Sequence, residues 1–301
     1  MQFRLLLILA FVAFLAPDAK AQDEVAPDTV TAEDYRIYSG SGEPLAWEDL
    51  VQRVGDAQVI LVGENHNDPV AHHMEVAILQ AALMMEDRPA AGSMEMFTTD
   101  VQSVVDEYLA GYITERHFRS ESRPWQNYET DYRPFVEAAR AAERPVIAAN
   151  APRRYVNRVS RLGPDSLTEL PESAKQWLAP LPYAFASEAY KAEWDALMAE
   201  AMAGMPAPDS ASGGNHGMGM GNALYSQSLW DATMAYSIAR YLLDNPEDRV
   251  VHIVGSFHVK NGTGIPEHIE AYRPGTRQLI IVVEPVDDPT AFGEEHAGLG
   301  D

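Results

Sequence analysis

Two short apolar segments of this chain each end in the pattern Gly-x-x-His. Residues 59–62 are followed by Gly63-Glu64-Asn65-His66, and residues 250–254 by Gly255-Ser256-Phe257-His258. A β-branched apolar run of this length beside a glycine is typical of a buried strand in a parallel sheet. Glycine lets the chain turn sharply there, and ligands of open α/β sheets bind just beyond the carboxyl ends of such strands. The pattern therefore predicts two histidines close to a ligand site.

Strand-like and helix-like segments alternate through most of the chain. Further strand-like runs cover residues 90–96, 145–149 and 279–283, and a long helical pattern covers residues 223–243. This alternation predicts an α/β fold with a mainly parallel sheet flanked by helices. Residues 111–130 show no clear period and are interpreted as a functional or covering loop.

The chain divides into one folded domain and less ordered flanks. We expect the α/β domain over residues 46–286, with a helical cap inserted at about 160–222. Within that insert, residues 204–221 are rich in Gly, Met, Pro and Ser and predict a flexible loop. Residues 22–45 are interpreted as a flexible lead-in, and the acidic residues 287–301 as a disordered tail.

The first 21 residues resemble a secretory signal peptide. Arg4 precedes an apolar run over residues 5–16, and Ala19-Lys20-Ala21 fits a small-residue cleavage site. The alternatives are a buried N-terminal helix or a retained anchor. The signal predicts a bacterial protein that is exported to the periplasm or secreted.

The chain contains no cysteine and carries a formal net charge of −23. The absence of cysteine excludes disulfides, thiol nucleophiles and a lipid-modified cysteine, so no stable membrane anchor is expected after signal removal. An acidic surface repels nucleic acid and anionic lipid, and we expect neither as a partner.

Polar groups suited to chemistry follow several of the predicted strands. Glu64, His66, Glu95 and His258 form the candidate catalytic set. A carboxylate beside an imidazole makes the imidazole more basic, or orients it to act as a general base or as a metal ligand. Two imidazoles with a carboxylate also suit zinc, manganese or iron, so His66, Glu95 and His258 are candidate metal ligands. A single residue of this kind is more often a helix cap or a surface group. The hypothesis of a site rests on finding several of them at the ends of different strands.

A second group of residues is expected to support this set. Either His72 or His73 faces the site from the helix that follows the first strand. Gln227 and Asp231 are four residues apart and share one face of the long helix, where a buried aspartate needs a partner. The candidate supporting residues are His73, Arg153, Gln227, Asp231 and His268.

Haem ligands form a separate hypothesis. His216 and Met218 in the flexible loop offer imidazole and thioether ligands, and Tyr132 is one of several tyrosines that suit haem iron. The alternative is that methionine in the loop is incidental.

Several of these segments, taken together, resemble the ChaN-like haem-binding uptake proteins of the Tiki superfamily. The matching stretches are residues 59–66, His72-His73, residues 93–97 and 145–153, Gln227 with Asp231 and Met234, and residues 255–258 and 264–269. The resemblance implies an α/β domain that binds haem in bacterial iron acquisition. It also implies a tyrosine ligand, an outer-membrane lipoprotein and dimers that share stacked haems, although this chain lacks the lipid-modified cysteine.

The wider superfamily includes TraB/Tiki metalloproteases and looks related to erythromycin esterases. In those relatives the Gly-x-x-His histidines and nearby glutamates serve in hydrolysis, which implies the same for Glu64, His66, Glu95 and His258. Two hypotheses follow. The first is an exported haem-binding protein, and the second is a metal-dependent or His/Glu-dependent hydrolase of a peptide or small-molecule substrate. Either agrees with a homodimer.

Overall fold

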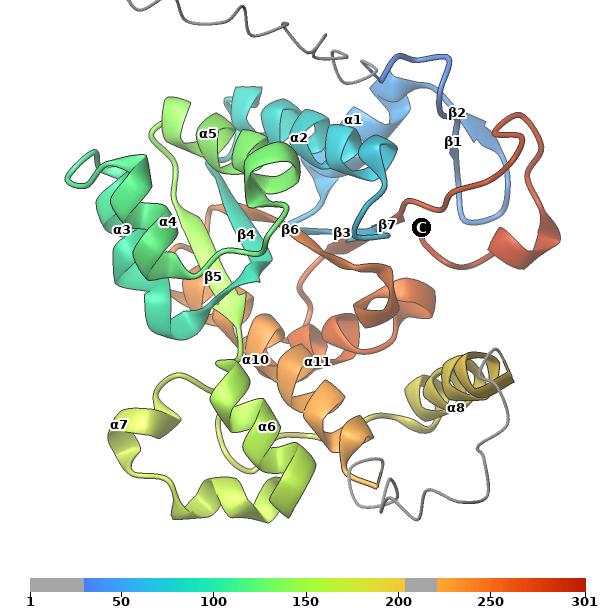
Figure 1. Cartoon of the computed structure of the whole chain (residues 1–301). Coiled ribbons are helices and arrows are strands. Elements are labelled where there is room, and N and C mark those ends of the chain that lie inside the picture. Colours follow the sequence, from blue (N-terminus) through green and yellow to red (C-terminus); the bar gives the residue numbers. More distant parts are fainter. Residues whose placement is uncertain (1–29, 204–220) are drawn as a thin grey trace, which may run out of the picture.

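A five-stranded parallel sheet forms the centre of the computed structural model, which describes residues 30–203 and 221–301. Its strand order is β5-β4-β6-β3-β7 (Figure 1). The strands are β3 (Val59–Glu64), β4 (Ala90–Thr98), β5 (Val146–Asn150), β6 (Arg249–Gly255) and β7 (Gln278–Val282). Each arises from one of the apolar runs, so the predicted α/β fold is confirmed.

The register of β3 and β6 brings the two Gly-x-x-His motifs side by side. The strands pair in parallel from Val59 opposite Val250 to Glu64 opposite Gly255. Both strands therefore end at the same edge of the sheet, although the motifs are far apart in the sequence.

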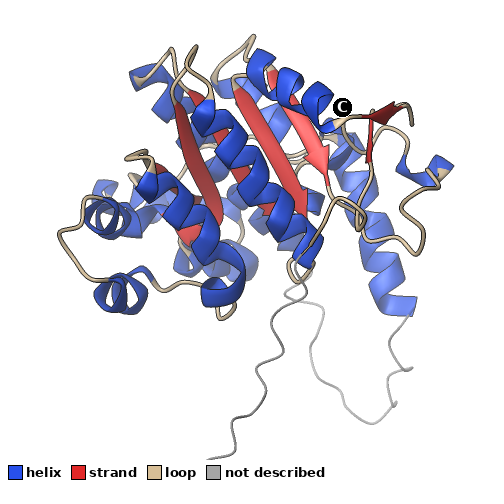
Figure 2. Ribbon diagram, turned by 90° about the horizontal axis from the view of Figure 1, so that it is seen from above, coloured by secondary structure: helices blue, strands red, loops and turns tan. Residues whose placement is uncertain are grey.

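Helices cover both faces of the sheet. On one face lie α1 (Trp47–Asp56), α2 (Pro69–Met84) and α5 (Arg133–Ala141), and helices lie over the strands in the view from above (Figure 2). The other face packs against α10 (Ala223–Asp244) and α11 (Ile265–Tyr272), labelled below the sheet in Figure 1. Because β3, β4, β5 and β6 are buried between these layers, their sequences are continuous apolar runs, whereas the edge strand β7 is mostly half-buried.

A further group of helices extends the fold beyond the strand ends. It comprises α6 (Arg153–Leu162), α7 (Glu172–Lys175) and α8 (Glu188–Ala203). Val159 and Leu167 of this region pack against Leu229 and Ala232 of α10 in a core of their own. Helix α10 therefore packs against the sheet on one side and against the α6 region on the other, and it joins the two.

The segment expected to be a loop at residues 111–130 is partly helical. It contains α4 (Glu115–Ser122) and the start of a π-helical turn, Tyr128–Tyr132, and α3 (Gln102–Leu109) precedes it. Phe118 and Tyr128 are buried in the main core. Tertiary burial of these two aromatic rings orders a segment whose own sequence shows no helical period.

In the described residues, 30–45 and 287–301, both flanks of the domain are more ordered than expected. Residues of the lead-in form a hairpin of β1 (Ile37–Tyr38) and β2 (Pro44–Leu45). The acidic tail packs along β7, where Asp301 N donates to Ile280 O and Ile280 N donates to Asp301 Oδ2. These bonds pair the end of the tail with Ile280 on the open edge of the sheet, so the expected disorder of residues 287–301 is corrected.

None of the helices in the two described ranges combines the length and apolar character that crossing a membrane requires. The expected signal peptide at residues 1–21 lies outside the described residues, as do His216 and Met218 in the Gly/Met-rich loop.

Candidate functional site

The first histidine motif forms a carboxylate–imidazole pair at the end of β3. Glu64 is the last residue of the strand, and its Oε1 accepts a hydrogen bond of 2.7 Å from His66 Nδ1. This bond raises the pKa of His66 against the opposing effect of burial. It also holds the ring proton on Nδ1, which leaves Nε2 as the free nitrogen of the neutral ring.

Gly255 gives the His66 ring its room. A Cβ at this position would lie 2.9 Å from His66 Cε1 and 3.1 Å from Nε2. The glycine of the second motif therefore lets the imidazole of the first lie across the end of β6. The His66 side chain remains 43% exposed.

The second histidine is buried between two carboxylates. His258 follows β6 in a short 3₁₀ turn, and its Nδ1 donates to Asp231 Oδ1 on α10. Its Nε2 lies 3.7 Å from Glu95 Oε1 on β4. Burial lowers the pKa of His258, but the two carboxylates outweigh it and raise the pKa to about 9. His258 is therefore an imidazolium at neutral pH.

Glu95 connects the two motifs. Its Oε2 accepts a hydrogen bond of 2.9 Å from Gly255 N, while its Oε1 faces His258. The side chain also contributes to raising the pKa of His66. A single carboxylate on β4 thus lies between the two imidazoles.

These groups open into a large cavity of about 1230 Å³. His66, Glu95 and His258 line it at the strand ends. The structure thus brings together residues from three strands, with Glu64 directly beneath His66. Their roles in chemistry stay predictions.

The supporting residues divide into two groups. Asp231 and Gln227 contact His258, with the Gln227 amide nitrogen 3.3 Å from both ring nitrogens, and Arg153 lines the cavity. His73 instead is exposed on α2, with its ring 6.2 Å from that of Tyr35. His268 is buried on α11 against Tyr272 and does not line the cavity.

His72, the other histidine of the pair on α2, faces inward. Its Nδ1 lies 3.0 Å from Glu64 Oε2 and 3.3 Å from Glu75 Oε2. Burial would raise the pKa of Glu64, but hydrogen bonds from His66 and Tyr132, with the His72 contact, lower it to about 2. The sequence alone does not decide whether His72 or His73 faces the site. The structure shows that His72 does, so the predicted supporting role of His73 is corrected to His72.

Tyr132 does not offer a haem ligand in this structure. Its side chain is fully buried, and its hydroxyl donates a hydrogen bond of 2.8 Å to Glu64 Oε1. Burial raises the pKa of this hydroxyl far above its usual range. Because haem iron takes tyrosine as the ionised phenolate, the buried and bonded Tyr132 hydroxyl does not fit the predicted role of haem ligand. Tyr132 instead orients the carboxylate that holds His66.

The predicted metal trio of His66, Glu95 and His258 does not form a compact ligand set. Among the described residues, the three acidic or imidazole side chains that bring donor atoms within 4.8 Å of one another are Glu64, His72 and Glu75.

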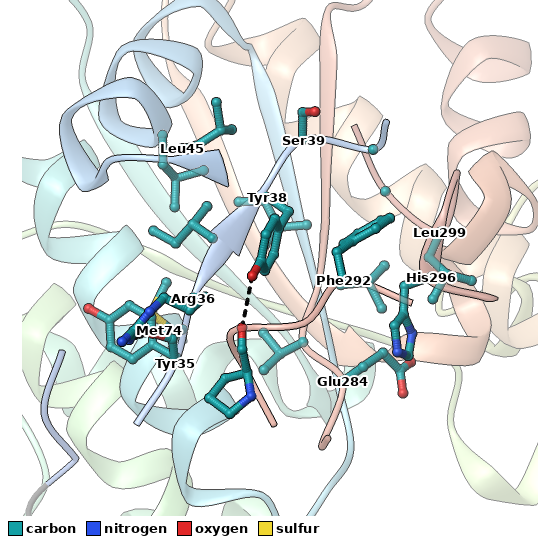
Figure 3. Close-up of a pocket in the computed structure, with 18 of the residues that line it drawn as sticks. Tyr35, Arg36, Tyr38, Ser39, Leu45, Met74, Glu284, Phe292, His296 and Leu299 are labelled. Carbon is teal, nitrogen blue, oxygen red and sulfur yellow. Dashed lines mark hydrogen bonds between the residues drawn. The ribbon is translucent and has the colours of Figure 1, made fainter. Parts of the chain in front are cut away.

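A second, smaller cavity of about 340 Å³ lies at the β7 edge, under the β1–β2 hairpin and the tail (Figure 3). Tyr38 crosses it and donates to Pro289 O, while Phe292 and Leu299 contribute apolar surface. It shares no lining residue with the large cavity. None of the predicted site residues lines it.

Comparisons with known proteins place the chain in a family. A family model described as haem-binding uptake, Tiki superfamily, ChaN matches residues 50–269. The chain belongs to the ChaN family. That assignment confirms the resemblance found in the sequence, and both Gly-x-x-His motifs fall inside the matched range.

A solved structure supports the fold of this ChaN-family chain. The structure entitled "Cofacial heme binding to ChaN of Campylobacter jejuni" superposes with a TM-score of 0.65 at 17% sequence identity. The match covers 85% of this chain and 93% of the other. A search of curated proteins gives no match.

The sequence missed the aromatic and basic lining of the large cavity in this ChaN-family member. Three of its five tryptophans, Trp125, Trp194 and Trp230, line the cavity together with Arg123 and Arg154. Trp125 also meets the His66 ring edge-on, at 4.8 Å between centroids. The aromatic and charged residues at 111–130 were the one available signal, since these side chains have no shared spacing in the sequence.

Gly63, the glycine of the first Gly-x-x-His motif, is expected to be important for stability. A Cβ on Gly63 would lie 2.9 Å from Ser256 Cα and 2.9 Å from Val259 Cγ2. We expect Gly63→Ala to lower the free energy of unfolding by about 1–3 kcal/mol, because the turn after β6 must move away. Urea denaturation measures this loss.

Gly55→Ala is the matched control for that substitution. Gly55 lies in α1, and a Cβ there would meet Met85 Sδ at an ordinary 3.8 Å. Alanine favours a helix over glycine, so this variant should be slightly more stable than the wild type. Equal stability of both variants would contradict a close approach at Gly63.

Proposed function

We propose that this ChaN-family protein binds haem in the large cavity and that His66 Nε2 is the iron ligand. The proposal rests mainly on one observation. His66 is a half-exposed imidazole in the cavity whose other nitrogen is held by a buried carboxylate. The family assignment and the haem-binding title of the similar Campylobacter jejuni structure support haem as the bound molecule.

The cavity suits a flat macrocycle with acidic substituents. Its volume of about 1230 Å³ exceeds the roughly 300–1,000 Å³ usual for small-molecule sites. Trp125, Trp194 and Trp230 offer aromatic surface to a porphyrin ring.

Three arginines line the same cavity in a chain of net charge −23. Arg123 and Arg154 are both held by Asp100, at 2.8 and 2.5 Å, and Arg153 lies beside them. Guanidinium groups fixed in this way are suited to carboxylates. We infer that they meet the haem propionates.

The two histidines are not equivalent as iron ligands. His258 is buried, with Nδ1 bonded to Asp231 and Nε2 facing Glu95, so both of its ring nitrogens already face carboxylates. His66 donates its Nδ1 proton to Glu64 and keeps Nε2 free. If haem binds in the cavity, His66 would hold its iron through Nε2, and the Glu64 carboxylate would make this imidazole a stronger donor.

Hemin titration tests the proposal. We expect the Soret band of hemin to shift and to saturate at a fixed stoichiometry when micromolar protein is added. Serum albumin, a nonspecific haem binder, and buffer alone serve as references. An unchanged hemin spectrum at micromolar protein would contradict haem binding.

We further infer that the protein is exported and handles haem during uptake. The signal-like residues 1–21 carry this inference, together with the family description. Expression in a bacterium, osmotic fractionation and N-terminal sequencing test it. A mature chain that begins at Gln22 in the periplasm is expected, and a full-length chain in the cytosol would contradict export.

The Asp231–His258–Glu95 array favours hydrolysis as a second candidate function. An imidazolium between two carboxylates can act as a general acid, and Glu95 can act as a base toward water. This function predicts ester or peptide turnover that His258→Ala abolishes. Equal turnover in wild type and variant would remove it.

A further inference from the structure

A compact buried cluster lies behind His66, outside the set of residues that lines the large cavity. Glu64 comes from the end of β3, while His72 and Glu75 are three residues apart on α2 and therefore share one helix face. We propose that Glu64, His72 and Glu75 form a binding site for one divalent transition-metal ion, such as zinc or manganese.

The two buried carboxylates of the cluster favour a bound cation. The side chains of Glu64 and Glu75 are 0% and 1% exposed. Within the described part of the chain, Glu64 Oε2 and Glu75 Oε1 have no hydrogen-bond partner. Two buried carboxylates with unsatisfied oxygens are costly unless positive charge lies between them.

The surroundings of His72 prepare its Nδ1 as a ligand. On the other side of the ring, Nε2 lies 3.3 Å from His66 O and 3.5 Å from Asp131 Oδ2. Asn127 holds that aspartate through a bond of 2.7 Å. Both neighbours of Nε2 are acceptors, so they retain the ring proton there. Metal-bound histidines generally donate their second N–H to a carboxylate or carbonyl in this way.

The spacing of the donor atoms suits direct coordination. A tetrahedral ion with bonds of about 2.0–2.1 Å separates its ligands by roughly 3.3–3.4 Å. His72 Nδ1 lies 3.0 Å from Glu64 Oε2 and 3.3 Å from Glu75 Oε2. One nitrogen and two oxygens, without sulfur, favour zinc, manganese or ferrous iron over copper(I). Water would take the fourth position.

Bound protons are the competing occupant of the cluster. A protonated His72 and one protonated carboxyl would neutralise it without metal. A divalent ion would displace both protons, one from His72 Nδ1 and one from the carboxyl pair, and the net charge would stay the same. Metal affinity should therefore rise with pH, with close to two protons released per ion.

Metal analysis of untagged, haem-free protein tests the proposal. The protein is incubated with Zn²⁺ alone or Mn²⁺ alone, dialysed and analysed by mass spectrometry, and proton release is measured by calorimetry in two buffers. We expect close to one ion per chain. Glu75→Gln and His72→Ala should lower the affinity by at least about 100-fold, and Asp131→Asn by about 10–100-fold.

His73→Ala is the matched control, because it removes an exposed histidine from the same helix. It should bind like the wild type. Wild-type protein that retains no more ion than His72→Ala would overturn the proposal and leave protons as the occupant. If a variant fails to fold, Co²⁺ added to the wild type is the alternative test. The absorption bands of tetrahedral Co²⁺ should appear and should disappear when Zn²⁺ displaces the cobalt. Absence of these bands would overturn the proposed site. None of these readouts uses haem, so they stand apart from the haem proposal.

Discussion

Asp231→Asn is expected to lower the free energy of unfolding by about 2–3 kcal/mol below pH 6.5. Asp231 is 1% exposed and bonds the buried His258 imidazolium. Asparagine keeps the size and a hydrogen-bonding oxygen but loses the negative charge. His258 then remains beside Glu95 alone, and its pKa should fall toward or below the usual value near 6.5.

The effect should depend on pH in a defined direction. The pKa of His258 is raised to about 9 in the folded protein, from 6.5. The stability that this proton contributes is fully present below pH 6.5 and is lost as the pH rises through 9. Wild type and Asp231→Asn should therefore converge near pH 10.

Urea denaturation at pH 6 and pH 10 measures this difference. Asp195→Asn is the control, because Asp195 is 61% exposed and pairs with the exposed Lys191. It should change stability by less than about 0.5 kcal/mol at both pH values. A pH-independent loss in Asp231→Asn would mean that packing, rather than the ion pair, accounts for the effect.

His66→Ala is expected to weaken haem binding by at least about 100-fold, because it removes the proposed iron ligand. Its side chain is 43% exposed, so the fold should tolerate the change. Hemin titration followed by the Soret band measures the affinity, and circular dichroism checks the fold.

Glu64→Gln tests the role of Glu64 in orienting His66, separately from the role of His66 as the proposed iron ligand. Glutamine can still hydrogen-bond His66 but no longer carries the charge that raises the pKa of the ring. Haem affinity should fall by about 10–100-fold. His73→Ala should bind hemin like the wild type, and a similar loss in that variant would show that the effect of His66→Ala is not specific.

The central sheet could be predicted because each strand is a short apolar run that needs burial on both faces. The β1–β2 hairpin could not, since strands of two residues show no periodicity. The tail was expected to be disordered from its acidic composition. Its order comes from pairing of Asp301 with the β7 edge, a long-range contact that composition does not record.

The site could be predicted in part. Gly-x-x-His after two strands placed His66 and His258 correctly at one edge, and a buried aspartate on the long helix indicated a charged partner. The sequence could not show that His72 is the histidine that points inward, because His72 and His73 are adjacent at the start of a helix. The phenol of Tyr132 suits haem iron chemically, but the sequence does not show that its hydroxyl is buried and bonded to Glu64.

The most direct measurement is the absorption spectrum of ferric haem bound to His66→Gly, with and without free imidazole. The account predicts that this variant loses the wild-type spectrum and that added imidazole restores it by occupying the vacated ligand position. A variant that binds hemin with the wild-type spectrum and affinity, without imidazole, would contradict ligation by His66.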